Sequence, residues 1–385
     1  QIPSPAYVFM IKSDLLFQEL LKVMVNNNAS DLYLKPFQTP VLRIEGNLVP
    51  VKIDEILPTF TEEILDFVAT PSQKKQFETN PELNLIYSFP ELRDRFRINF
   101  YKNKGNISLV VRRINSIIPS IEELNLPSIL KKFVLYKRGL VIVCGPTGTG
   151  KSTTLASMLD FVNQNYKKHI VTIEDPIEYI IDDKKSYISQ REVGIDTNSF
   201  ADALKSVVRQ TPDIVMIGET RDKVTAVSIL QLAETGHLIL TTLHSPNTVQ
   251  AIVRILQFFE QHEHKEIVNY LASNLIAVVS QKLIPRIDGK GRVPVVEILI
   301  MNARMQELLM DMEFKQMKAE IDKFLTDGMQ SFDISLINLY AKELISLETA
   351  LEYAEVPHDL QLKIRTWGIK PGGELPEHLE VLPDI

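Results

Sequence analysis

The segment from Gly145 to Ser152 combines residue types that bind phosphate groups, at the spacing G-x-x-x-x-G-K-S. Its glycines allow successive backbone N–H groups to converge on the phosphates of a nucleotide, and a helix N-terminus adds a favourable dipole. Lys151 would reach the β- and γ-phosphates, and the Ser152 hydroxyl would bind Mg²⁺. The apolar run 140–144 before the loop and the helical pattern 153–159 after it favour this interpretation over a chance glycine-rich turn. The sequence therefore predicts a nucleoside triphosphate site. The predicted contacts are Gly145, Pro146, Thr147, Gly148, Thr149, Gly150, Lys151, Ser152 and Thr153.

Carboxylates follow two further apolar runs and could act together with this loop. Glu219 closes one run, so its carboxylate could hold Mg²⁺ or a water bound to it; a solvated strand end is the alternative. Glu174, Asp175 and Glu178 place three carboxylates within five residues, and like charges this close need a nearby cation. Mg²⁺ and Lys151 would supply that charge, and one glutamate could polarise the attacking water. An acidic surface turn is the alternative. The predicted metal ligands are Ser152 and Glu219.

Two histidines flank the apolar run 238–243. His237 and His244 are seven residues apart, so as strand residues they would point to opposite faces of a sheet. We therefore do not expect them to share a metal. One could contact phosphate and the other an interface, while a hydrogen-bonded core histidine is the alternative for each.

Arginines alternate with apolar residues in the segment 93–100. Arg95 and Arg97 share one face of this predicted strand, and the apolar residues between them share the other. A face that is simply solvated is one interpretation. The other is that these arginines, with Arg112, reach a phosphate bound to another subunit, since arginine is permanently charged and forked.

Strand and helix patterns predict where these groups lie. From residue 140 strands alternate with helices, which is typical of an α/β domain with a largely parallel sheet. The predicted strands 170–173, 214–219 and 237–244 each carry candidate groups, and ligands gather at the carboxyl ends of parallel strands. We therefore expect the acidic and histidine clusters to converge on the phosphate loop.

The first hundred residues instead mix strands with separate helices, which indicates a small α+β domain. A capped amphipathic helix is predicted from Ser13 to the asparagine cluster at 26–28. Other predicted helices cover 61–68 and 72–77, and predicted strands cover 31–34, 40–44, 83–89, 93–101, 107–114 and 293–300. The predicted regions are an N-terminal domain at 10–116, a linker at 117–127, a second domain with C-terminal helices at 128–367, and a disordered tail at 368–385.

Bulk composition limits the function classes. The 385 residues are 45% hydrophobic and 24% charged, with a net charge of −7 that argues against general nucleic-acid binding. Cys144 is the only cysteine, which excludes a disulfide framework and a Cys-based zinc site within one chain and fits a reducing compartment. No run approaches a membrane span or a signal peptide. Residues 1–9 precede Met10 and could be a leader or part of something longer.

The order of these motifs resembles that of the secretion-superfamily ATPases, whose signatures are called the Walker A, Asp, Walker B and His boxes. The matching segments are 145–152, 172–178, 213–219, and 233–237 with 242–244, and 189–194 and 272–275 are also similar. The resemblance implies ATP as the nucleotide, a PAS-like N-terminal domain, a RecA-like P-loop domain and a homohexameric ring with nucleotide at subunit interfaces. It also implies that Arg97 and Arg112 are arginine fingers, with Arg95 a weaker candidate. It favours Glu178 as the catalytic carboxylate, and Glu174 remains the alternative.

Within this superfamily the chain is most similar to the type IV pilus retraction ATPases, PilT and PilU. Related branches carry a four-cysteine zinc element that this chain lacks, and the segment 304–311 departs from the PilT motif AIRNLIRE in a way that looks more like PilU. The resemblance implies a cytoplasmic motor at the inner-membrane base of the pilus, acting on a PilC-like platform protein, with PilT as a possible co-motor. Two alternatives remain: an ATP-binding ring subunit that mainly reinforces a partner ATPase, and a RecA-like nucleic-acid translocase, against which the acidic charge counts.

Overall fold

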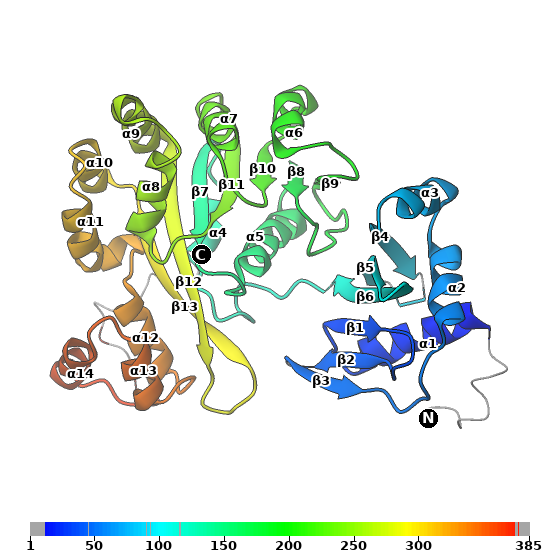
Figure 1. The fold of residues 1–385 in the computed structure, drawn as a ribbon. Coiled ribbons are helices and arrows are strands. Elements are labelled where there is room, and N and C mark those ends of the chain that lie inside the picture. Colours follow the sequence, from blue (N-terminus) through cyan, green and yellow to red (C-terminus); the bar gives the residue numbers. More distant parts are fainter. Residues whose placement is uncertain are drawn as a thin grey trace. The chain divides into compact units, whose positions relative to one another are not determined.

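The computed structural model describes residues 12–44, 46–89, 91–92, 94–114, 117–373 and 376 (Figure 1). The chain divides into two compact units. The first ends at Ile117 and also includes Glu178–Ile180, and the remaining residues from Ile118 form the second. Residues 1–9 and most of the predicted tail lie outside the described residues. The four region limits predicted above stay predictions.

The first unit is built on a six-stranded antiparallel sheet with the order β3-β2-β1-β6-β5-β4. Its strands are β1 (Asp31–Leu34), β2 (Val41–Ile44), β3 (Asn47–Pro50), β4 (Glu82–Phe89), β5 (Asp94–Asn103) and β6 (Asn106–Ile114). Its helices are α1 (Ser13–Asn26), α2 (Pro58–Val68) and α3 (Pro71–Thr79). On β5, Phe96, Ile98 and Phe100 are fully buried in one apolar core with residues of the three helices. The predicted α+β arrangement is confirmed.

The second unit contains a seven-stranded sheet with the order β13-β12-β7-β11-β10-β8-β9, parallel throughout except for the β12–β13 pair. Its strands are β7 (Gly139–Cys144), β8 (His169–Glu174), β9 (Tyr187–Glu192), β10 (Ile214–Ile217), β11 (Leu238–Leu243), β12 (Leu275–Pro285) and β13 (Arg292–Ile300). Its helices are α4 (Leu130–Phe133), α5 (Lys151–Asn165), α6 (Phe200–Val207), α7 (Lys223–Glu234), α8 (Thr248–Leu256), α9 (His264–Asn274), α10 (Ala303–Met310), α11 (Phe314–Glu320), α12 (Phe332–Ala341), α13 (Leu347–Tyr353) and α14 (Pro357–Thr366). Short 3₁₀ helices are η2 (Val208–Gln210), η3 (Gln261–Glu263) and η4 (Ile321–Asp327). The predicted, mostly parallel α/β sheet with C-terminal helices is confirmed.

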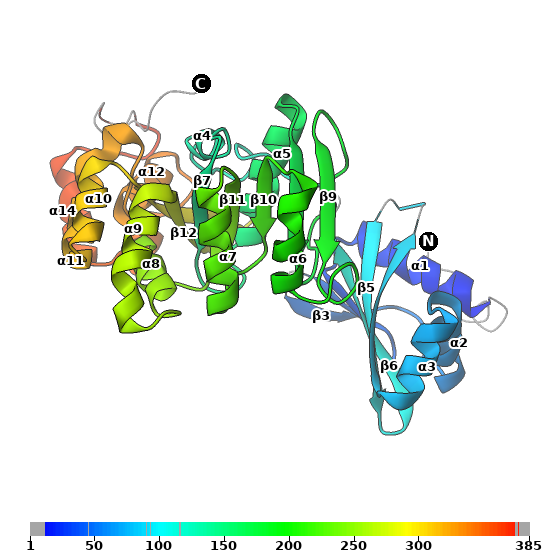
Figure 2. The same ribbon diagram turned by 90° about the horizontal axis from the view of Figure 1, so that it is seen from above.

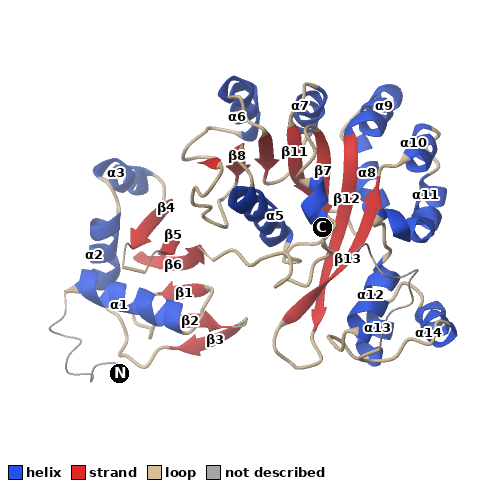
Figure 3. Ribbon diagram, turned by 180° about the vertical axis from the view of Figure 1, so that it is seen from behind, coloured by secondary structure: helices blue, strands red, loops and turns tan. Residues whose placement is uncertain are grey.

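Apolar side chains cover both faces of this sheet. On β7, Leu140 and Ile142 belong to one apolar cluster, whereas Val141 and Val143 belong to another. Helices α6 to α9 cover the first face, and α4 and α5 cover the second (Figure 2). Strands β12 and β13 extend beyond their neighbours, where α12, α13 and α14 pack against them around a third cluster (Figure 3). The parallel strands are therefore packed on both faces, and their carboxyl ends lie at one edge of the sheet.

Three strands and the capping of one helix differ from the sequence expectation. Strand β3 is exposed along its whole length and β9 has no apolar alternation, so neither carries a pattern typical of a strand. Strand β12 opens with the apolar run 275–279, a signal typical of a buried strand that sequence reasoning missed. Helix α1 spans Ser13–Asn26 as predicted, but its N-cap residue is Lys12, which makes no side-chain capping hydrogen bond, and the Ser13 hydroxyl donates to Glu63.

Candidate nucleotide-binding and catalytic site

The phosphate loop leaves the carboxyl end of β7 and enters α5. Gly145, Gly148 and Gly150 have φ values of +147°, +78° and +86°, which side chains rarely adopt. A Cβ at Gly145 would also lie 2.4 Å from the backbone oxygen of Gln281. The backbone conformation at these three positions therefore favours glycine, and the loop curls as a phosphate-binding loop must.

Lys151 folds over this loop. Its side chain is buried, and its ammonium donates to the backbone oxygens of Gly145 at 3.0 Å and Pro146 at 2.9 Å. Thr149 closes the loop further, since its hydroxyl also donates to Pro146 at 2.9 Å. Nucleotide phosphates can replace these neutral acceptors with charged ones, which make stronger hydrogen bonds to an ammonium. The loop therefore fits a nucleotide.

Strand order brings three candidate groups to the same edge of the sheet. In the sheet, β7 is followed by β11, β10 and β8, and all four strands are parallel. Glu174, Glu219 and His244 therefore lie at, or just beyond, the carboxyl ends of β8, β10 and β11. The predicted convergence of these groups on the edge that carries the phosphate loop matches the strand order. Their catalytic roles stay predictions.

Glu219 contacts two side chains that can donate hydrogen bonds to it. Arg221 Nη2 lies 2.8 Å from one carboxylate oxygen, and His244 Nε2 lies 3.2 Å from the other. The hydrogen bond to Glu219 raises the pKa of the Arg221 guanidinium above its ordinary value. Arg221 also lies 3.8 Å from Asp175. Sequence reasoning missed Arg221; the available signal was an arginine two residues after a strand-end acid.

The three carboxylates around Pro176 occupy different environments. Glu174 is 6% exposed and accepts from the Thr172 hydroxyl at 2.6 Å and from the amide of Gln190 at 3.2 Å. Asp175 and Glu178 are exposed. Within the second unit, Arg221 supplies a cation near Asp175, in addition to the predicted Mg²⁺ and Lys151. Which glutamate polarises the attacking water stays a prediction.

The two histidines lie at opposite ends of β11. This strand begins at Leu238 and ends at Leu243, so neither histidine is a strand residue, and the alternation on which the prediction of opposite faces rested does not extend to them. His237 lies at the amino end, near the backbone oxygen of Leu232 at 3.3 Å, roughly 20 Å along the strand from His244. Within one chain, only His244 lies at the same edge as the phosphate loop.

Ser152 and Glu219 have suitable chemistry for Mg²⁺. In the part of the chain that the structure describes, no group of three or more His, Cys, Asp or Glu side chains is arranged to hold a metal ion. Mg²⁺ in nucleotide sites, however, uses one or two protein oxygens together with phosphates and water. Ser152 offers a hydroxyl at the start of α5, and Glu219 offers a carboxylate just beyond β10. These two oxygen donors fit Mg²⁺.

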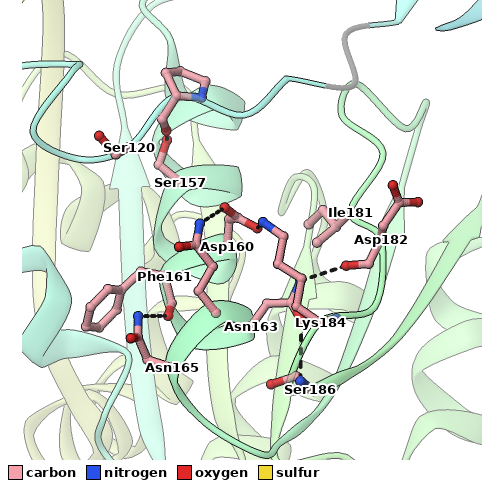
Figure 4. Close-up of polar contacts among 12 residues, drawn as sticks. Ser120, Ser157, Asp160, Phe161, Asn163, Asn165, Ile181, Asp182, Lys184 and Ser186 are labelled. Carbon is pink, nitrogen blue, oxygen red and sulfur yellow. Dashed lines mark hydrogen bonds and ion pairs between the residues drawn. The ribbon is translucent and has the colours of Figure 1, made fainter. Parts of the chain in front are cut away.

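Polar side chains on α5 fasten the segment that leads into β9 (Figure 4). The fully buried Asn163 accepts from the backbone N–H groups of Lys184 at 3.0 Å and Ser186 at 3.3 Å, and donates to the backbone oxygen of Asp182 at 2.8 Å. Asp160 accepts from the Lys184 ammonium at 2.6 Å. The helix that begins at the phosphate loop therefore also positions the chain that follows the carboxylates.

The first unit presents the predicted arginines on neighbouring strands. Arg97 on β5 is paired in register with Arg112 on β6, and Arg112 with Asp31 on β1. Arg112 Nε donates to the buried Asp31 at 2.8 Å, while its own side chain is 69% exposed. Arg95 is exposed on the same strand as Arg97.

The family model described as "Type II/IV secretion system protein" matches residues 11–319. The chain belongs to this family. It is 42% identical to the type IV pilus ATPase PilU of Pseudomonas aeruginosa over 349 residues, which cover 91% of each chain. It is 38% identical to the type IV pilus retraction ATPase PilT of the same organism, over 89% of this chain and 98% of PilT.

A solved structure agrees with these relatives. The crystal structure of the pilus retraction motor PilT with bound ADP matches the present chain with a TM-score of 0.83 and 36% sequence identity, and the match covers 89% of this chain and 98% of PilT. The resemblance predicted from the motif order is confirmed, and so is the prediction of an ATPase. This secretion-family chain is a nucleotide-using ATPase.

Proposed function

We propose that this chain hydrolyses ATP with Mg²⁺ to power type IV pilus retraction, in a PilU-like role. The observation that carries the proposal is the loop from Gly145 to Ser152 at the same sheet edge as Glu219 and His244, in a chain similar to PilU over 91% of its length. Bound Mg²⁺ would neutralise charge that develops on the phosphates. Ser152 and Glu219 would hold it.

The chain's own residues divide the remaining work. Lys151 binds the β- and γ-phosphates, and Glu178, or alternatively Glu174, orients the attacking water and accepts its proton. His244 contacts the γ-phosphate side of the site. Arg97 and Arg112 reach the phosphates held by a neighbouring subunit of a homohexamer, with His237 at an interface.

The cycle converts these contacts into motion. Arginine–phosphate bonds hold adjacent subunits together while ATP is bound, and hydrolysis with phosphate release weakens them. We propose that the resulting movements act on a PilC-like inner-membrane platform protein from the cytoplasmic side, with PilT as a co-motor. In the ranges that the structure describes, no helix combines the length and apolarity needed to cross a bilayer.

The direct test is turnover by the purified chain. We expect Mg²⁺-dependent release of phosphate from ATP, which Lys151→Ala abolishes. The matched control is Lys205→Ala, an exposed lysine of the same unit with a weak partner in Asp202 at 3.8 Å, and it should leave turnover unchanged. Background turnover in the wild type, with ATP still bound, would favour the ring subunit that reinforces a partner ATPase.

A second experiment tests pilus retraction in cells. Deletion of the gene, alone and together with any sister retraction ATPase, should leave excess surface pili and reduce twitching. The wild-type gene should restore both, and the Lys151→Ala variant should not. Normal pili and twitching in both deletions would overturn the proposal, and salt-sensitive DNA binding at physiological ionic strength would support a translocase instead.

A further inference from the structure

Gln281 packs against the phosphate loop from a strand that no phosphate-binding motif includes. Strand β12 pairs in parallel with β7, with Ser280 opposite Cys144, so residue 281 is level with the first residue of the loop. Its side chain is only 3% exposed. Position 281 is thus a fixed point in the core beside the loop.

Both ends of the Gln281 amide are used. Nε2 donates to the backbone oxygen of Thr149 at 2.7 Å, and Oε1 accepts from the Thr154 hydroxyl at 2.8 Å. Thr149 belongs to the loop, and Thr154 is a fully buried residue in the first turn of α5. Because exchange of the amide oxygen and nitrogen would break both hydrogen bonds, this network fixes the orientation of the side chain.

The first of these bonds orients a backbone N–H group. In a planar trans peptide the carbonyl and the following N–H point in opposite directions. Since Gln281 holds the carbonyl of Thr149, the N–H of Gly150 is directed away from Gln281. Gly150 also has a φ of +86°, and a Cβ there would lie 3.0 Å from the Gln281 amide nitrogen. The side chain and the glycine therefore fit each other closely.

We propose that Gln281 is a positioning residue for nucleotide binding: it holds the peptide between Thr149 and Gly150 so that the Gly150 N–H faces the phosphates. This inference rests on the proposed function, because it assigns the loop to ATP. Gln281 does not touch the nucleotide. It acts through the loop backbone, whose N–H groups are the phosphate ligands in such cradles.

The test uses Gln281→Glu in the full chain. A carboxylate can still accept from Thr154 but cannot donate to Thr149, so the peptide is released while side-chain volume is kept. We expect the Kd for ADP and the KM for ATP to rise about tenfold or more, with a smaller change in kcat, because the lost contact serves substrate and transition state alike. If this variant does not fold, Gln281→Met removes the same donor without adding charge.

The matched control is Gln330→Glu. Gln330 is also buried, and its amide donates to the backbone oxygen of Val296 at 2.9 Å. Its change should lower the thermal midpoint while the ADP Kd stays within about twofold. A Gln281 variant with wild-type ADP affinity, or a Gln330 variant that weakens ADP equally, would overturn the inference. Because ADP binding needs no turnover, wild-type protein that binds ADP without hydrolysing ATP would overturn only the proposed function.

Discussion

Arg97 on β5 and Arg112 on β6 lie directly opposite each other across an antiparallel strand pair, so two cations share one face of the sheet. Like charges in this arrangement are destabilising. Buried Asp31 compensates Arg112 through a 2.8 Å hydrogen bond. Among the described residues, Arg97 forms no ion pair. The anion between subunits that we propose above would relieve the repulsion between these two arginines.

We therefore predict that Arg97→Ala and Arg112→Ala each lower ATP turnover, by about 10³-fold if they act as arginine fingers. The Kd for nucleotide should change much less, and the thermal midpoint should not fall for Arg97→Ala, because a repulsion is removed. Steady-state kinetics and nucleotide titration measure the two effects. Lys102→Ala, which removes an exposed cation from the same strand, serves as the control. Unchanged turnover in both variants would show that Arg97 and Arg112 simply face solvent and are not arginine fingers.

The separation of the two histidines gives a second prediction. His244 lies beside Glu219 at the loop edge, so His244→Ala should weaken binding of a non-hydrolysable ATP analogue relative to ADP by about 10- to 100-fold, the cost of one hydrogen bond to a charged group. His237→Ala should leave this ratio of affinities unchanged. The measurement is a pair of equilibrium titrations per variant. If His244→Ala and His237→Ala changed the ratio of affinities equally, the placement of His244 alone beside the phosphate loop would be contradicted.

Asn163 gives a prediction about stability. Its replacement by Ala leaves three backbone groups of the segment 182–186 without their partner, which should destabilise the second unit by roughly 3 kcal/mol. Amide hydrogen exchange of Lys184 and Ser186 should accelerate. The control is Asn165→Ala on the same helix, whose exposed side chain donates only to Phe161, and it should change stability by less than about 0.5 kcal/mol. Unaltered exchange in the Asn163 variant would count against this anchoring.

Glu297 gives a pH-dependent prediction. Burial raises the pKa of its carboxyl above the ordinary value, so the folded state holds the proton more tightly than the unfolded state. Stability is therefore lost as pH rises from the unfolded pKa through the raised folded pKa, and the penalty is complete above it. Glu297→Gln keeps an acceptor for the N–H and hydroxyl of Thr248, both of which donate to Glu297 in the wild type.

The thermal midpoint of Glu297→Gln, relative to wild type, should accordingly increase between about pH 4.5 and neutral pH and then level off. The gain in unfolding free energy is about 1.4 kcal/mol for each pH unit by which the folded pKa exceeds the unfolded pKa, or roughly 3 °C to 6 °C. The hydroxyl of Thr248 stabilises the charged carboxylate and so lowers the pKa of Glu297; Thr248→Val removes that donor, and its thermal midpoint relative to wild type should fall rather than rise over the same pH range. A difference between Glu297→Gln and wild type that stays constant from pH 4 to pH 8 would rule out the raised pKa.

Local sequence determined the parts of this protein that depend on neighbouring residues. The spacing of glycines and Lys151 set the phosphate loop, because only glycine adopts the positive φ values found there. Apolar alternation set β5 and the buried face of its sheet, and the order of the motifs set the family. Strands β3 and β9 were not predicted because their pairing, rather than their own pattern, makes them strands.

Tertiary structure alone decided which distant residues meet. Parallel pairing of β7, β11, β10 and β8 brings Glu219 and His244 together and leaves His237 at the far end, although both histidines flank the same run. Gln281 carries no local signal and Arg221 only a weak one, its place two residues after Glu219, because their importance comes from Thr149 and Glu219, which the fold places beside them. Spacing along the chain fixes backbone conformation, but the direction and register of strands fix which side chains share a site.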